Sequence, residues 1–253
     1  MKKLIKRFFQ TLGYDLHRLN SSPDVGTASR PVGSMKMLLE DLYNRGFNPR
    51  SILDVGANRG DWSRIAKSIF KEAEFFLIEP QIEMKIYLEA FCKEFPGSQF
   101  FLAGAGATPG ELMLTIWDDL AGSSFLPSES DELRESGKQR SVKIVTIDSL
   151  LEKELMPMPQ LVKLDIQGFE LEALKGGARL FGNVEFFILE ASLFEFIEGQ
   201  PIFDEVVAFM KDRGYVVYDF PGFLRRPHDG ALGQCDICFA KANGVLRANN
   251  CWL

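Results

Sequence analysis

Short apolar runs alternate with amphipathic stretches from residue 51 onward. Runs rich in β-branched and aromatic residues predict strands, and apolar positions spaced by three or four residues predict helices. This alternation is typical of βα units, which predicts a doubly wound α/β fold around a mainly parallel sheet. The expected strands cover residues 52–55, 74–78, 99–102, 111–117, 142–147, 161–166, 184–191, 215–220 and 234–240, and the expected helices cover 61–70, 82–95, 170–175 and 203–213.

The N-terminal part differs from this pattern. Residues 2–19 have apolar positions at helical spacing behind a basic start, and residues 20–30 are rich in Ser, Pro and Gly. We therefore expect an amphipathic helix with a linker over 1–30 and one α/β domain over 31–253. Such a helix can lie on an anionic membrane surface, although packing on its own domain or on a second copy of the chain is more common, so a homodimer stays open.

Composition and charge narrow the expected partners. The chain carries 29 Lys and Arg against 35 Asp and Glu, a net charge of −6, so no general positive field would gather a nucleic acid. We expect no nucleic-acid partner. No apolar run approaches the roughly 20 residues of a membrane span, and the start lacks the features of a signal peptide, which favours a cytoplasmic protein.

Two of the four cysteines, Cys235 and Cys238, have the spacing of a redox or zinc motif. Both fall in the expected strand 234–240. Residues three apart in a strand point to opposite faces, so these thiols are not expected to share a metal or a disulfide.

The sharpest local motif is residues 53–60, Leu-Asp-Val-Gly-Ala-Asn-Arg-Gly, which ends a buried strand and opens a helix. Ligands of open α/β sheets bind at the carboxyl ends of strands, and glycines there allow close approach to the backbone. The motif therefore predicts a small molecule over Gly56 and Gly60, although a tight turn without a ligand would also use glycine. The acid Asp54 before the turn suits a cationic amino group better than a phosphate.

Glu79 ends the second expected strand, near the offset at which an acidic residue meets a ribose diol in nucleotide-binding folds. The same pairing would serve a nicotinamide dinucleotide. The dinucleotide motif G-x-G-x-x-G, however, needs a glycine where this chain has Asn58, which disfavours close binding of a pyrophosphate.

A second group of polar residues follows strand 161–166. Asp165 is delivered to the same sheet edge, with Gln167 and Glu170 just beyond, where they can position an acceptor hydroxyl or take its proton. Glu170 also suits a helix N-terminus. The polar stretch 118–140, which contains Ser124, is too long for an ordinary connection and suggests a lid or substrate loop. The candidate substrate residues are Ser124, Gln167 and Glu170.

Several blocks of the chain, in order, resemble those of the FkbM family of methyltransferases over about residues 50–241. They are Asp54-Val55-Gly56-Ala57-Asn58-x-Gly60, Glu79-Pro80, Val145-Thr146-Ile147-Asp148-Ser149-Leu150, Leu164-Asp165-Ile166-Gln167-Gly168-Phe169-Glu170 through Lys175-Gly176, Ile188-Leu189-Glu190 and Asp236-Ile237-x-Phe239. The resemblance implies a Rossmann-like, seven-stranded class I methyltransferase that uses S-adenosylmethionine, mostly to methylate hydroxyls of sugars, glycolipids or polyketide-type products.

The resemblance also implies roles for single residues. The turn residues would surround the methionine part of the cofactor, Glu79 the ribose, and the region around Ala105 the adenine. Apart from the resemblance, Trp62 follows the glycine turn at the start of a helix, where it can cover the cofactor or belong to the core. The candidate cofactor-binding residues are Asp54, Gly56, Ala57, Asn58, Gly60, Trp62, Glu79, Pro80, Ala105 and Asp165.

Methyl transfer to an alcohol needs positioning and a proton acceptor. The first candidate is Asp165, the second is Glu190 at the end of the neighbouring strand, and the third is His228 in the final loop. Oxygen ligands from Asp165, Glu190 and Asp236 would suit Mg²⁺, but their spacing does not require a metal and none is predicted. The competing hypotheses are a nicotinamide-dependent oxidoreductase and a non-catalytic scaffold of the same fold.

Overall fold

The computed structural model describes residues 30–118, 120–126, 133, 135–249 and 251. The amphipathic helix expected over residues 2–19, and with it any contact with a membrane, lies outside the described residues. Of the helices in the described part of the chain, none is both long and apolar enough to cross a membrane.

The centre of the fold is a sheet of seven strands in the order β3-β2-β1-β7-β8-β10-β9. All neighbours pair in parallel except β10, which is antiparallel to β8 and to β9. The prediction of a doubly wound, mainly parallel sheet is therefore confirmed. The strands are β1 Ser51–Val55, β2 Glu74–Glu79, β3 Gln99–Leu102, β7 Leu161–Leu164, β8 Phe186–Ser192, β9 Tyr215–Arg225 and β10 Leu232–Lys241.

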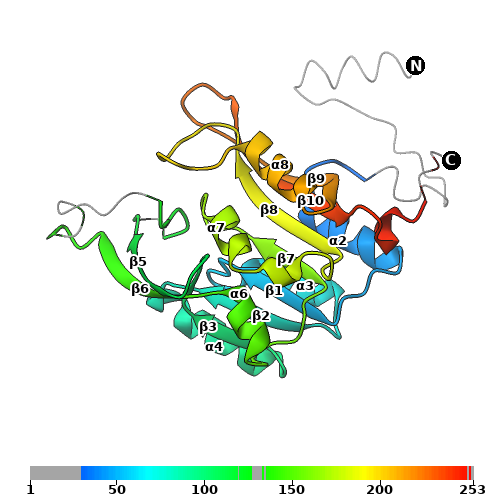
Figure 1. The fold of residues 1–253 in the computed structure, drawn as a ribbon, viewed down its shortest axis with the longest axis horizontal. Helices are drawn as coiled ribbons and strands as arrows, with labels where there is room; N and C mark the ends of the chain where they lie inside the picture. The colour runs from blue at the N-terminus through cyan, green and yellow to red at the C-terminus, as the bar shows by residue number, and fades with distance from the viewer. Residues whose placement is uncertain (1–29, 119, 127–132, 134, 250, 252–253) are drawn as a thin grey trace, which may run out of the picture. The chain divides into compact units, whose positions relative to one another are not determined.

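Helices cover both faces of this sheet (Figure 1). One core contains side chains of α2, α3 and α4, and the opposite core contains side chains of α6, α7 and α8. Their bounds are α2 Met35–Asn44, α3 Asp61–Ile69, α4 Lys85–Glu94, α6 Ile147–Glu152, α7 Glu170–Lys175 and α8 Phe203–Asp212, with short 3-10 turns at Ile82–Met84, Ala178–Leu180 and Val245–Arg247.

A second, three-stranded sheet was not anticipated from the pattern. It has the order β4-β6-β5, with β4 at Gly104–Ala105, β5 at Gly110–Thr115 and β6 at Gln139–Val145. The strands β5 and β6 form an antiparallel arm that projects beyond the main sheet (Figure 1). Strand periodicity was readable here, but it does not tell which sheet a strand joins.

The two cysteines of the C-x-x-C spacing lie in β10. Cys235 packs in the core of α6, α7 and α8, whereas Cys238 packs in the core of α2, α3 and α4. The prediction that they point to opposite faces is confirmed, so they cannot act together on one metal or disulfide.

Candidate active site

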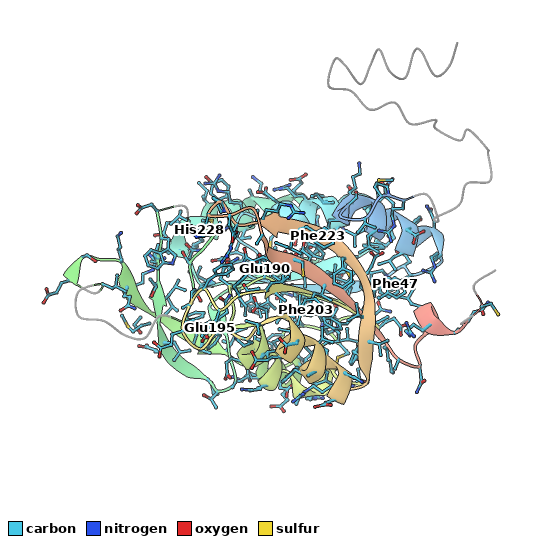
Figure 2. All side chains as sticks on the ribbon, turned by 90° about the horizontal axis from the view of Figure 1, so that it is seen from above. Phe47, Glu190, Glu195, Phe203, Phe223 and His228 are labelled. Carbon is cyan, nitrogen blue, oxygen red and sulfur yellow. The ribbon has the colours of Figure 1, made fainter. Side chains whose placement is uncertain are left out.

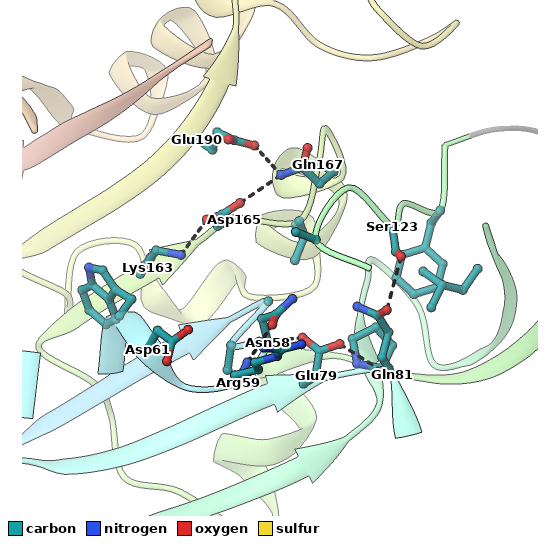
Figure 3. A pocket seen from close by; sticks show the side chains of 18 residues that line it. Asn58, Arg59, Asp61, Glu79, Gln81, Ser123, Lys163, Asp165, Gln167 and Glu190 are labelled. Atoms are coloured by element: carbon teal, nitrogen blue, oxygen red, sulfur yellow. Dashed lines mark hydrogen bonds and ion pairs between the residues drawn. The ribbon is translucent and has the colours of Figure 1, made fainter. Parts of the chain in front are cut away.

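A cavity of about 360 Å³ opens at the carboxyl ends of β1, β2 and β7, where the order of the strands reverses (Figure 3). This is the place where open α/β sheets bind their ligands. Strand β5 and the segment that follows it, before β6, supply one wall. The lining residues are Gly56, Ala57, Asn58, Arg59, Asp61, Trp62, Glu79, Pro80, Gln81, Leu114, Ala121, Ser123, Phe125, Lys163, Asp165, Ile166, Gln167 and Glu190.

The glycine turn forms one end of the cavity. Gly56 has a φ of +81°, and a Cβ atom there would lie 2.0 Å from the backbone oxygen of Asp165. Glycine is therefore required because the turn after β1 packs against the chain after β7. Asn58 follows with a φ of +48°, a conformation that asparagine tolerates better than most residues.

Glu79 is held at the same end by two backbone amides. Its carboxylate oxygens accept hydrogen bonds from the N–H of Asn58 at 2.8 Å and of Gln81 at 2.9 Å. Burial raises the pKa of Glu79 more than these bonds lower it. The carboxylate thus ties the turn after β1 to the segment after β2, and Glu79 lines the cavity.

Some predicted cofactor residues lie behind the cavity wall. Asp54 is fully buried, and its Oδ2 accepts a hydrogen bond from the Ser63 hydroxyl at 2.6 Å. Gly60 precedes α3 with a φ of +78°, and Ala105 is buried in the core. These three residues do not line the cavity, whereas Gly56, Ala57, Asn58, Trp62, Glu79, Pro80 and Asp165 do.

The other end of the cavity is a connected row of side chains, Asp165, Gln167 and Glu190, with Lys163 at its end (Figure 3). We call this row the acidic row. The ammonium of Lys163 lies 2.9 Å from Oδ2 of Asp165, and the side-chain amide of Gln167 donates to Asp165 Oδ1 at 3.2 Å and to Glu190 Oε2 at 2.9 Å. Gln167 adopts a φ of +55°, so the backbone is strained at the residue whose side chain bridges the two carboxyl groups.

Lys163 was missed from the sequence. Its position in the apolar run 161–166 gives no sign of function alone, but residues two apart in a strand share a face, and Asp165 is two residues on. The strand register also places Lys163 beside Asp54 of β1. The spacing of two residues to Asp165 is therefore the only hint in this segment of the sequence, and the pairing with Asp54 is visible only in the structure.

Electrostatics separates the two candidate proton acceptors of this row. Burial, followed by the charges of Asp165, Glu170 and Asp236, raises the pKa of Glu190 to about 9. This shift favours the protonated form of Glu190 at neutral pH, which disfavours it as a proton acceptor. Burial lowers the pKa of Lys163, but Asp165 and Asp54 together raise it further, so the ammonium stays charged.

The substrate candidates are placed differently from one another. Gln167 lines the cavity, but Ser124 is buried and donates its hydroxyl to the backbone oxygen of Gln167 at 2.9 Å, while its neighbour Ser123 reaches the cavity. Glu170 accepts from the N–H of Ile166 at 2.9 Å and of Gly168 at 3.3 Å, and burial raises its pKa to about 7. Ser124 and Glu170 thus brace the loop and do not line the site.

His228, the third candidate proton acceptor, lies in the connection between β9 and β10 and is not part of the cavity lining (Figure 2). The candidate ligand set of Asp165, Glu190 and Asp236 is likewise not assembled as a metal site. Within the described residues, no group of three or more His, Cys, Asp and Glu side chains is placed to hold a metal ion.

Comparison with known proteins decides the family. The family model of the methyltransferase FkbM domain matches residues 54–217, more than half of the chain. The chain belongs to the FkbM methyltransferase family. Its cofactor is therefore S-adenosylmethionine, and the matched segment contains both the glycine turn and the acidic row of the cavity.

Individual relatives are distant. The hexuronic acid methyltransferase AglP of Haloferax volcanii is 28% identical over 157 residues, which is 62% of this chain and 60% of that protein. The chain thus spans less than two thirds of that relative. Among solved structures, a methyltransferase FkbM from Methylobacillus flagellatus is 16% identical, with a TM-score of 0.49 over 75% of this chain and 44% of that one. The magnesium protoporphyrin IX methyltransferase of Synechocystis is 11% identical, with a TM-score of 0.46 over 95% and 96%.

The residues of the cavity fit this cofactor. A volume of about 360 Å³ lies within the roughly 300–1,000 Å³ of small-molecule sites. The indole N–H of Trp62 is buried without a hydrogen-bond partner, and Glu79 offers carboxylate lone pairs for hydroxyl groups. Glu79, Asn58 and Trp62 would hold the cofactor.

Proposed function

We propose that the protein transfers a methyl group from S-adenosylmethionine to a hydroxyl oxygen of a sugar or sugar-containing acceptor. The observation that carries this proposal is the position of Asp165, whose carboxylate lies in the same cavity as the glycine turn and Glu79. One cavity thereby offers a cofactor end and a proton-accepting end.

The cofactor supplies an activated methyl group, so the protein's task is to position the acceptor and remove its proton. The hydroxyl oxygen forms the new C–O bond as the C–S bond breaks, and the electron pair of that bond goes to sulfur. The hydroxyl proton passes to Asp165. Lys163 and Gln167 each hold one oxygen of this carboxylate, and protonated Glu190 can donate a hydrogen bond to the acceptor.

A sugar acceptor is supported by two observations. One relative is named as a hexuronic acid methyltransferase. In addition, Phe194 and Phe196 follow β8 beyond Glu190 and are 37% and 47% exposed. Exposed aromatic rings suit the apolar face of a sugar ring.

The test is methyl transfer from isotopically labelled S-adenosylmethionine to a panel of uronic acid glycosides, with the matching neutral glycosides as controls. We expect a labelled product that keeps its methyl group under alkaline hydrolysis, because ethers survive it and methyl esters do not. A labile product would place the methyl group on a carboxylate instead of a hydroxyl. Binding of cofactor without transfer to any member of the panel would contradict a sugar acceptor.

A further inference from the structure

Lys163 is a charged side chain inside the sheet. Its side chain is 7% exposed, and its ammonium lies 2.9 Å from Asp165 Oδ2, 3.9 Å from Asp54 Oδ1 and 5.7 Å from the centre of the Trp62 ring. Asp54 Oδ1 is buried and has no hydrogen bond. Burying a lysine is costly unless it is paired, so this position needs an explanation beyond packing.

The surroundings of Lys163 are acidic. Asp165, Glu190 and Asp236 come from the neighbouring strands β7, β8 and β10 or their ends, and Glu190 and Asp236 are directly paired across the sheet. Two of the residues that line the cavity in the described part of the chain are cations. Arg59 is at the glycine turn, where it lies over the Tyr87 ring, so Lys163 is the cation of the acidic row.

The charge at this end of the cavity changes during methyl transfer. S-adenosylmethionine carries a positive sulfonium, whereas S-adenosylhomocysteine carries a neutral thioether in its place. Because the methyl carbon must meet the hydroxyl whose proton Asp165 accepts, the sulfur lies toward the acidic row. An acidic row without a cation would favour the charged starting state over a transition state in which that charge is disappearing.

We propose that Lys163 is the counter-cation of the acidic row and sets the relative affinity for the charged methyl donor and its neutral product. This inference rests on the proposed methyl transfer at Asp165. Lys163 offsets the attraction of the carboxylates for the sulfonium, so that the donor is not held too tightly before transfer.

The test is the ratio of the dissociation constants of S-adenosylhomocysteine and S-adenosylmethionine, measured by calorimetry at fixed pH and ionic strength. In Lys163→Met we expect this ratio to rise about tenfold, because the sulfonium gains an uncompensated partner. In Asp165→Asn we expect it to fall about tenfold, and Lys163→Arg should stay within about twofold of the wild type. Lys175→Met, which removes an exposed lysine paired with Glu172, is the matched control and should leave the ratio unchanged.

Folding is checked by circular dichroism. If Lys163→Met does not fold, Asp54→Asn with Lys163→Met removes one charge of each sign and leaves Asp165 uncompensated, so the ratio should still rise. A ratio within about twofold of wild type in the folded variants, or an equal loss of affinity for both ligands, would overturn the proposal. The binding measurements use no acceptor. The ratio of the two dissociation constants can therefore be interpreted even if none of the sugars is methylated in the transfer assay.

Discussion

The two ends of the cavity are built in different ways. At the glycine turn, the backbone fixes the arrangement, because Glu79 accepts hydrogen bonds from two backbone N–H groups and Gly56 lies against the backbone of Asp165. At the acidic row, side chains fix one another, as Lys163 and Gln167 hold the two oxygens of Asp165. The first arrangement depends on backbone conformation, whereas the second depends on which side chains are present.

This contrast predicts that substitutions at the acidic row change catalysis more than binding. The largest effect is expected for Asp165→Asn, which keeps the shape of the side chain but removes its capacity to take a proton. Methyl transfer should fall about 1,000-fold, while S-adenosylhomocysteine affinity stays within about threefold. Initial rates with an acceptor methylated by the wild type, together with calorimetry, measure both quantities. Glu172→Gln, an exposed carboxyl outside the cavity, is the control, and an unchanged rate in Asp165→Asn would remove this residue from the mechanism.

At the glycine turn, the matching prediction concerns stability. Gly56→Ala places a Cβ against the Asp165 carbonyl and forces a left-handed conformation, so the free energy of unfolding should fall by about 3 kcal/mol. Gly182→Ala is the control, because Gly182 has a φ of +82° but open space around it, and about 1 kcal/mol is expected there. Urea denaturation compares the two. Equal losses would mean that the close approach to Asp165 is not a constraint.

Glu79→Gln tests whether the turn is a binding element. The backbone N–H groups of Asn58 and Gln81 donate hydrogen bonds to Glu79. In the variant, the side-chain NH₂ group faces one of these donors and that hydrogen bond is lost, so cofactor affinity should fall about tenfold. Calorimetry with S-adenosylhomocysteine measures this loss. Glu74→Gln, at the exposed start of the same strand, should bind as the wild type does. Wild-type affinity in Glu79→Gln would separate this carboxylate from the cofactor.

The smallest expected effect is the pH dependence of stability at Glu190. Its pKa in the folded protein is about 9, well above the ordinary value of 4.5, so the folded state keeps a proton that the unfolded state releases. Wild-type stability should therefore decline as pH rises from about 4.5 to 9, and Glu190→Gln should be spared that decline. Each pH unit between the two pKa values changes the difference by about 1.4 kcal/mol, so we expect the variant to gain roughly 1 kcal/mol relative to wild type between pH 6.5 and pH 7.2, read from urea midpoints. A constant difference across this range would contradict the raised pKa.

The same contrast explains what could be predicted from the sequence. The strands, the glycine turn and Glu79 were readable because periodicity and turn chemistry are local. Lys163 was not, because its burial depends on Asp54 in a neighbouring strand. The prediction of Ser124 as a substrate residue missed the cavity by one residue, since the isolated bridge with Thr115 determines which of the two serines faces it. The small sheet was missed because the alternation of apolar and polar residues in a strand does not tell which strand it pairs with.

The pairing of β1 with β7 fixes the distance between the two ends of the cavity. The N–H of Asp165 donates to the carbonyl of Val55 at 3.0 Å, so the residue after β7 is bonded to the last residue of β1, directly before the turn. Neighbouring strands lie about 4.8 Å apart, and this spacing hardly varies among proteins. The separation of the glycine turn from Asp165 is therefore set by the sheet. Leu114, Ser123 and Phe125 line the cavity from β5 and the segment that follows it, outside this pairing, so a change in their size would alter the cavity without altering that separation.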